Sequence, residues 1–79
     1  GNAAIDTPPS IDLSNAEEKE ITVSKMETID QNGNTWLYIV DSENNIYRAK
    51  YADVLNMLLV SEGDTITILT DGTYYRLPE

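Results

Sequence analysis

Residues Thr65 to Leu77 read TITILTDGTYYRL, the pattern of two strands joined by a tight turn. Threonine alternates with apolar side chains over 65–70, which is the period of a half-buried strand. Asp71-Gly72 follows, a dipeptide that favours the positive φ angles of a hairpin turn. The return strand is predicted from Thr73 to Leu77, and Pro78 ends it because proline has no amide hydrogen for the ladder. We expect this hairpin to close a small antiparallel barrel.

The segment before the hairpin predicts a short helix. Ala52 to Val60 reads ADVLNMLLV, and its apolar residues do not alternate with polar ones. Their spacing suits a short helix that covers the open end of a sheet. Glu62-Gly63-Asp64 then turns the chain into the strand that begins at Thr65.

Three strands are expected ahead of this helix. The first begins at Ile21, and its apolar parity slips between Val23 and Met26, as a β-bulge causes. Turn residues follow at Asp30 to Asn34. The second strand, Thr35 to Asp41, carries apolar side chains on both faces, so we expect it to lie centrally and to be covered on both sides.

The register of the next hairpin determines which aromatic residues share a face, because a slip of one residue exchanges the two faces. A two-residue turn at Asn44-Asn45 is the favoured prediction, and it places Val40 opposite Ala49. The side chains that this register collects on one face are Trp36, Tyr38, Val40, Tyr47, Ala49 and Tyr51.

The alternative register has a five-residue loop that pairs Val40 with Ile46. It places the cations Arg48 and Lys50 opposite the aromatic residues of the second strand, and it requires that face to be solvated.

Three strands, a short helix and a hairpin are the element order of an OB-fold, and residues 21–77 resemble one. The resemblance is carried by the segments Val60-Ser61-Glu62-Gly63-Asp64-Thr65-Ile66 and Asp71-Gly72-Thr73-Tyr74-Tyr75. Similar segments occur in small barrel domains of uncharacterised bacterial secreted proteins and lipoproteins. The expected fold is thus mainly β, a five-stranded antiparallel OB-like barrel with a short helix between strands three and four; an SH3-like barrel is the alternative.

Residues 1–20 are interpreted as a flexible leader or tether, and residues 21–79 as the barrel domain. The leader contains Pro8-Pro9 and shows no hydrophobic period. Ser14 and Glu17 have the spacing of a capping box, so one helical turn over 16–20 is the alternative to an extended leader. The leader resembles the stalks of the same bacterial lipoproteins.

Composition narrows the classes of function. The 79 residues suffice for one domain, and five Lys and Arg against fourteen Asp and Glu give a net charge of −9, which argues against nucleic acid as a partner. The absence of Cys and His removes the usual nucleophiles, bases and ligands for transition metals. No apolar run approaches the roughly 20 residues of a membrane span. The chain begins at Gly1, from which we expect an exported protein: extracellular, periplasmic or at the cell surface, with a possible N-terminal lipid tether.

Acidic and amide side chains suggest two further sites, neither of which we favour. Asp30, Asn32 and Asn34 repeat the start of a Ca²⁺-binding loop, but Thr35 and Asp41 replace its required Gly and Glu, so a simple turn is the preferred interpretation and no metal or other cofactor is expected. A hydrolase needs two carboxylates across a cleft. The candidates all lie beside predicted turns or element ends: Asp41, Glu43, Asp53, Glu62, Asp64 and Asp71.

Aromatic residues are the most informative set, because the chain has five Tyr, one Trp and no Phe. Tyrosine favours half-buried positions where the ring packs and the hydroxyl stays in water. The candidate binding residues are Trp36, Tyr38, Tyr47 and Tyr51. Packing of these rings in the core and at the barrel ends is the alternative. Arg48, Lys50 and Arg76 are assigned to cross-strand pairing, with a small anion site as the alternative.

The sequence therefore predicts a noncatalytic, exported binding module for a protein, peptide or glycan. A purely structural spacer or assembly domain of a cell-surface protein is the alternative, and a small hydrolase is a third hypothesis.

Overall fold

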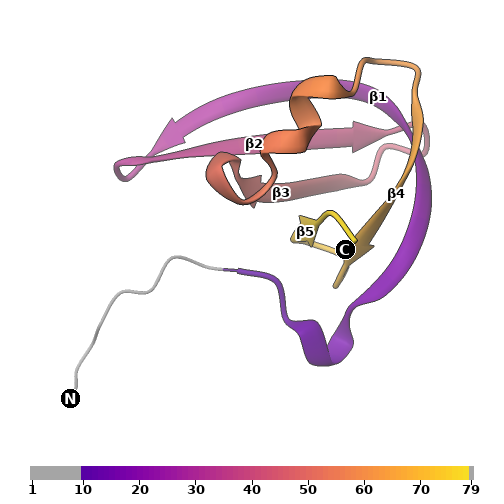
Figure 1. The fold of residues 1–79 in the computed structure, drawn as a ribbon, viewed down its shortest axis with the longest axis horizontal. Coiled ribbons are helices and arrows are strands. Elements are labelled where there is room, and N and C mark those ends of the chain that lie inside the picture. Colours follow the sequence, from indigo (N-terminus) through magenta and orange to yellow (C-terminus); the bar gives the residue numbers. More distant parts are fainter. Residues whose placement is uncertain (1–9, 79) are drawn as a thin grey trace.

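The computed structural model describes residues 10–78, which form a five-stranded antiparallel sheet curled into a nearly closed barrel (Figure 1). The strand order is β3-β2-β1-β4-β5. The elements in chain order are η1 (Leu13–Asn15), β1 (Glu17–Gln31), β2 (Asn34–Asp41), β3 (Ile46–Lys50), η2 (Tyr51–Asp53), η3 (Leu55–Leu59), β4 (Thr65–Thr70) and β5 (Tyr75–Arg76).

The two edges of the sheet meet at one short contact. Arg48 of β3 forms a parallel bridge with Tyr74, and its amide donates to the Thr73 carbonyl at 3.0 Å. In the middle of the sheet, strand β1 pairs with both β2 and β4. The edge strands β3 and β5 approach each other at this contact. This connectivity is that of the partly open Greek-key barrel, so the expected OB-like fold is confirmed.

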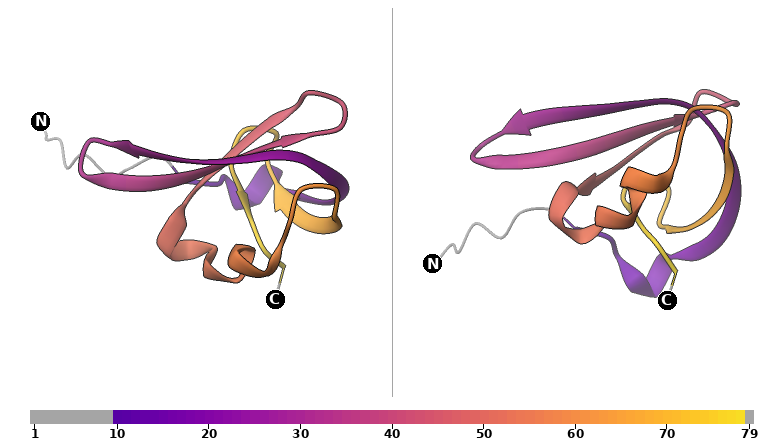
Figure 2. Two further views of the ribbon diagram at one scale, coloured as in Figure 1. Left: turned by 90° about the horizontal axis from the view of Figure 1, so that it is seen from above. Right: turned by 45° about the horizontal axis from the view of Figure 1, so that its top comes forward.

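Strand β1 serves both halves of the barrel because it bends, as Figure 2 shows. Residues 17–22 pair with β4, and residues 23–31 pair with β2. The pairing shifts between Val23 and Lys25, where the sequence predicted a bulge. At the same point the Val23 amide donates to the Asp64 carbonyl at 2.8 Å, and the Val23 carbonyl accepts from Gly63 at 2.7 Å.

The barrel begins earlier than expected. Glu17 to Glu20, predicted from the sequence to lie in the leader, belong to β1 and pair with β4. The helical turn also lies elsewhere: η1 is a 3₁₀ turn that Asp12 caps through the Ser14 amide, in place of a turn over 16–20. The part of the expected leader before Ser10 lies outside the described residues.

The favoured register of the β2–β3 hairpin is wrong, and the five-residue alternative is correct. Val40 pairs with Ile46, and the Asp41 amide donates to the Asn45 carbonyl at 3.0 Å. Asn44 takes a φ of +69°, in the left-handed region that asparagine tolerates. These features define a turn closed by one left-handed residue, a common hairpin loop that alternation of apolar residues does not reveal.

The Asp41 carboxylate selects this loop. It accepts hydrogen bonds from the Glu43 and Asn45 amides at 2.9 Å each, from the Asn45 side chain at 3.1 Å and from the Tyr47 hydroxyl at 3.0 Å. Asp41 is only 2% exposed, so these partners replace the water that an ionised carboxylate loses on burial.

The observed register turns a different set of side chains into the core. Leu37 and Ile39 of β2 face inward beside Ala49 and Tyr47 of β3. The remaining core residues are Ile21, Val23, Val54, Met57, Ile68 and Tyr75. Val54 and Met57 come from the segment expected to be a helix, which forms two 3₁₀ turns that cover one end of the barrel.

The closing hairpin is present, with a longer loop than predicted. Thr70 pairs with Tyr75, so four residues form the loop and β5 begins at Tyr75, not at Thr73. Gly72 has a φ of +102°, which favours glycine. Asp71 holds the loop by accepting from the amides of Thr73 and Tyr74.

The Asp41→Asn substitution tests whether this carboxylate holds the loop. The amide offers one acceptor oxygen in place of two, which leaves buried donors unsatisfied, so we expect the free energy of unfolding to fall by roughly 2 kcal/mol or more. Tyr47→Phe is the matched control, because it removes one hydrogen bond and is expected to cost about 1 kcal/mol. Urea denaturation at pH 7 measures both; equal losses would contradict the role assigned to Asp41.

Acid sensitivity provides a second test of Asp41. Burial alone would raise the pKa of Asp41, but the hydrogen bonds from Asn45, Tyr47 and Glu43 together lower it. A lowered pKa means that the stabilisation is present above the unfolded value of about 3.9 and is lost as pH falls through the folded value. We therefore expect Asp41→Asn to lose less stability than the wild type between about pH 5 and pH 2. Thermal denaturation across this range is the measurement, and parallel profiles would contradict it.

Candidate functional site

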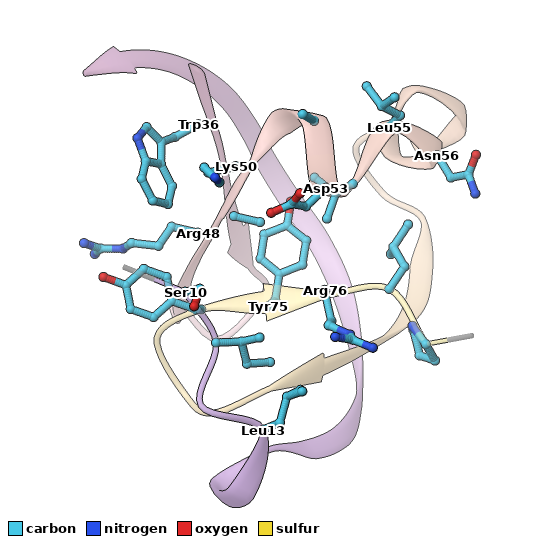
Figure 3. Close-up of a pocket in the computed structure, with 17 residues that line it drawn as sticks. Ser10, Leu13, Trp36, Arg48, Lys50, Asp53, Leu55, Asn56, Tyr75 and Arg76 are labelled. Atoms are coloured by element: carbon cyan, nitrogen blue, oxygen red, sulfur yellow. The ribbon is translucent and has the colours of Figure 1, made fainter. Parts of the chain in front are cut away.

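A cleft of about 780 Å³ lies along the seam where β3 and β5 separate (Figure 3). Its floor includes the buried residues Ala49, Val54 and Tyr75. Ser10 to Leu13 lie on one side and η2 and η3 on another. The cleft exists because β3 and β5 touch only near Arg48, after which β3 continues into η2.

One end of the cleft is built from aromatic rings and a guanidinium group. The rings of Trp36 and Tyr74 lie 6.4 Å apart between centroids, tilted by 45°. The guanidinium carbon of Arg48 lies 5.1 Å from the Tyr38 ring centroid and 6.0 Å from that of Tyr74. Both distances fall within the range of cation–π attraction, so the Arg48 side chain is held between two rings.

The cleft has a local charge opposite to that of the whole chain. Three of the five Lys and Arg line it, namely Arg48, Lys50 and Arg76. Among the described residues that line it, Asp53 is the only carboxylate. A chain with a net charge of −9 thus has a cleft with a cationic rim.

The four aromatic residues proposed from the sequence do not share one face. Trp36 and Tyr38 lie on the outer face of β2, where Trp36 is 8% exposed. Tyr47 points into the core, and Tyr51 packs against the core from η2. The grouping failed because it depended on the incorrect register of β2 and β3.

Tyr74 is not among the candidate binding residues predicted from the sequence, and a small anion site at Arg48, Lys50 and Arg76 is predicted there only as the alternative to cross-strand pairing. The alternative register was the available signal, since it alone places Arg48 and Lys50 across from Tyr38 and Trp36. The approach of Tyr74 had no such signal, because it depends on closure between strands far apart in the sequence.

Tyr47 belongs to a separate polar cluster with Asp41 and Lys19, outside the described lining of the cleft. Burial raises the pKa of the Tyr47 hydroxyl, which donates to Asp41. The Lys19 ammonium lies 5.8 Å from the centre of the Tyr47 ring, and the neighbouring hydroxyl raises the pKa of Lys19. These shifts keep Tyr47 neutral and Lys19 protonated near pH 7, which suits packing and not proton transfer.

The carboxylates and amides of the first hairpin bond within that hairpin. Asp30 accepts from the Thr35 hydroxyl at 2.6 Å, and the Asn34 side chain donates to the Asn32 carbonyl at 3.4 Å. Asn32 and Gly33 form the turn, both with positive φ. Within residues 10–78 no three His, Cys, Asp or Glu side chains are grouped as a metal site, and no helix has the length and apolarity to cross a membrane.

Topology and site geometry together describe an OB-like barrel with a cationic, aromatic-edged cleft. Comparisons with protein-family models, curated proteins and solved structures found no match to the chain.

Fluorescence of Trp36, the single tryptophan, tests the geometry of the aromatic end. Because the indole is nearly buried, we expect a blue-shifted emission and weak quenching by iodide. Tyr74→Ala removes the neighbouring ring and is expected to increase quenching, whereas Tyr74→Phe keeps the ring and is expected to leave it unchanged. Equal quenching of the two variants would show that Tyr74 does not cover the indole.

Proposed function

We propose that the chain is a noncatalytic binding module, exported and held by its N-terminal leader, whose ligand occupies the cleft between β3 and β5. The cleft itself carries this proposal. Its volume of about 780 Å³ lies within the range of small-molecule and oligomer sites, and charged groups and aromatic rings converge on it.

The position of the cleft on the barrel supports the same function. OB-fold barrels bind oligomers on the face of strands two and three, together with the loop that joins strands four and five. Trp36 of β2, Arg48 of β3 and Tyr74 of the β4–β5 loop supply the corresponding surface here.

The composition of the cleft favours binding over hydrolysis. Two carboxylates about 5 to 10 Å apart are needed for acid and base roles at a glycosidic bond. Asp53 is the only carboxylate among the described residues that line the cleft, and it is exposed. Raising a carboxyl pKa for acid catalysis requires a site that excludes water, which an open seam does not provide.

A structural spacer is the second candidate, and one observation favours it. Trp36 is nearly buried and Tyr38 is covered by Arg48, so part of the aromatic set is used for internal packing. A spacer has no ligand in the cleft, which makes the two functions separable by one experiment.

Blocking the cleft is that experiment. Ala52 is exposed and lines the cleft, so Ala52→Trp fills it without a change of charge. Thr28→Trp is the control, since Thr28 is an exposed residue of β1 outside the described lining of the cleft. We expect glycan or peptide array binding by the wild type and by Thr28→Trp, and its loss in Ala52→Trp. An array without hits, or hits that Ala52→Trp retains, would favour the spacer.

A further inference from the structure

The Arg48 side chain lies at the cleft in contact with two aromatic rings. Contacts with Tyr38 and Tyr74 fix its guanidinium group, so little side-chain entropy is lost when it binds. Its Nε atom is buried and has no acceptor among the described residues. The residue as a whole is half-buried and lines the cleft, and a guanidinium group can donate two parallel hydrogen bonds to a planar carboxylate.

Lys50 and Arg76 extend the positive charge along the same cleft. Lys50 pairs with Trp36 across β2 and β3, and Arg76 is in β5, so cations are contributed from both sides of the seam. A ligand with more than one negative group would therefore meet cations from both β3 and β5.

The charge of the whole chain limits how negative this ligand is. At physiological salt a charge acts over about 8 Å, so the cleft cations do not offset acidic surface farther away. A nucleic acid strand carries one charge per nucleotide and would extend beyond the cleft over a chain of net charge −9. A short ligand with few negative groups stays within the cleft and limits this repulsion.

The remaining polar groups favour sugar hydroxyls. Asp53 supplies acceptor oxygens, while Asn56 and Ser10 supply both donors and acceptors. Hydroxyl groups use both kinds of partner. An acidic peptide offers carboxylates but no row of hydroxyl groups for these partners. The half-buried Tyr74 ring at the end of the cleft offers an apolar surface for a sugar ring.

We propose that the cleft binds a short oligosaccharide that carries carboxylate groups, as a uronic acid chain does. This inference rests on the proposed function and names the ligand class of the same site. Arg48 holds one carboxylate, Lys50 attracts a second, and Asp53 accepts hydrogen bonds from hydroxyl groups.

Calorimetric titration with trigalacturonate tests the proposal, with its neutral methyl ester, a glutamate hexapeptide and a six-nucleotide deoxythymidine strand as comparison ligands. We expect trigalacturonate to bind most tightly, with an affinity that falls as salt is raised. Lys50→Gln is expected to weaken it about tenfold, the effect of one charge-assisted hydrogen bond. Lys25→Gln is the matched control, because it removes the same charge from an exposed residue of β1 outside the described lining of the cleft and is expected to have no effect.

The outcomes separate this inference from the function on which it rests. Equal binding of trigalacturonate and its methyl ester, tighter binding of the peptide or nucleotide, or no binding of trigalacturonate would overturn the ligand class. The binding function survives each of these results if the array hits are lost in Ala52→Trp. If Lys50→Gln and Lys25→Gln weaken trigalacturonate binding equally, the net charge of the chain and not a contact in the cleft determines the affinity. That result would also overturn the inference.

Discussion

The buried carboxylate of Asp41 is the constraint on which the arrangement of the barrel surface depends. Four hydrogen bonds to it define the loop between β2 and β3, and the loop defines the register of the two strands. In a strand pair the register determines the face of every side chain. One acidic residue at a strand end thus places Tyr47 in the core and Arg48 on the outside.

The outward position of Arg48 then has two effects. Its backbone closes the barrel through the Thr73 carbonyl, and its side chain lies between the rings of Tyr38 and Tyr74. Arg48 therefore lies where the two edges of the sheet are in contact, and its side chain is also one of the cations that line the cleft. Closure and the cationic rim of the cleft have a common origin in the β2–β3 register.

The element order was predictable because local patterns determine it. The bulge near Val23, the short helix before β4 and the turn at Asp71-Gly72 each follow from apolar spacing or from the turn preferences of aspartate and glycine. The register and the length of β5 were not predictable in this way. They depend on the carboxylates of Asp41 and Asp71, which accept hydrogen bonds from backbone amides. The alternation of apolar residues does not indicate such hydrogen bonds.

The Asp71 carboxylate also joins two segments that are distant in sequence. It accepts a hydrogen bond at 2.9 Å from the Asp12 amide, next to residues that form one side of the cleft. If the proposed N-terminal tether carries a load, the tension along it would reach the Asp12–Asp71 hydrogen bond before it reaches the ladder between β1 and β4. The side of the cleft formed by Ser10 to Leu13 would then be the first part of the described chain to respond to force.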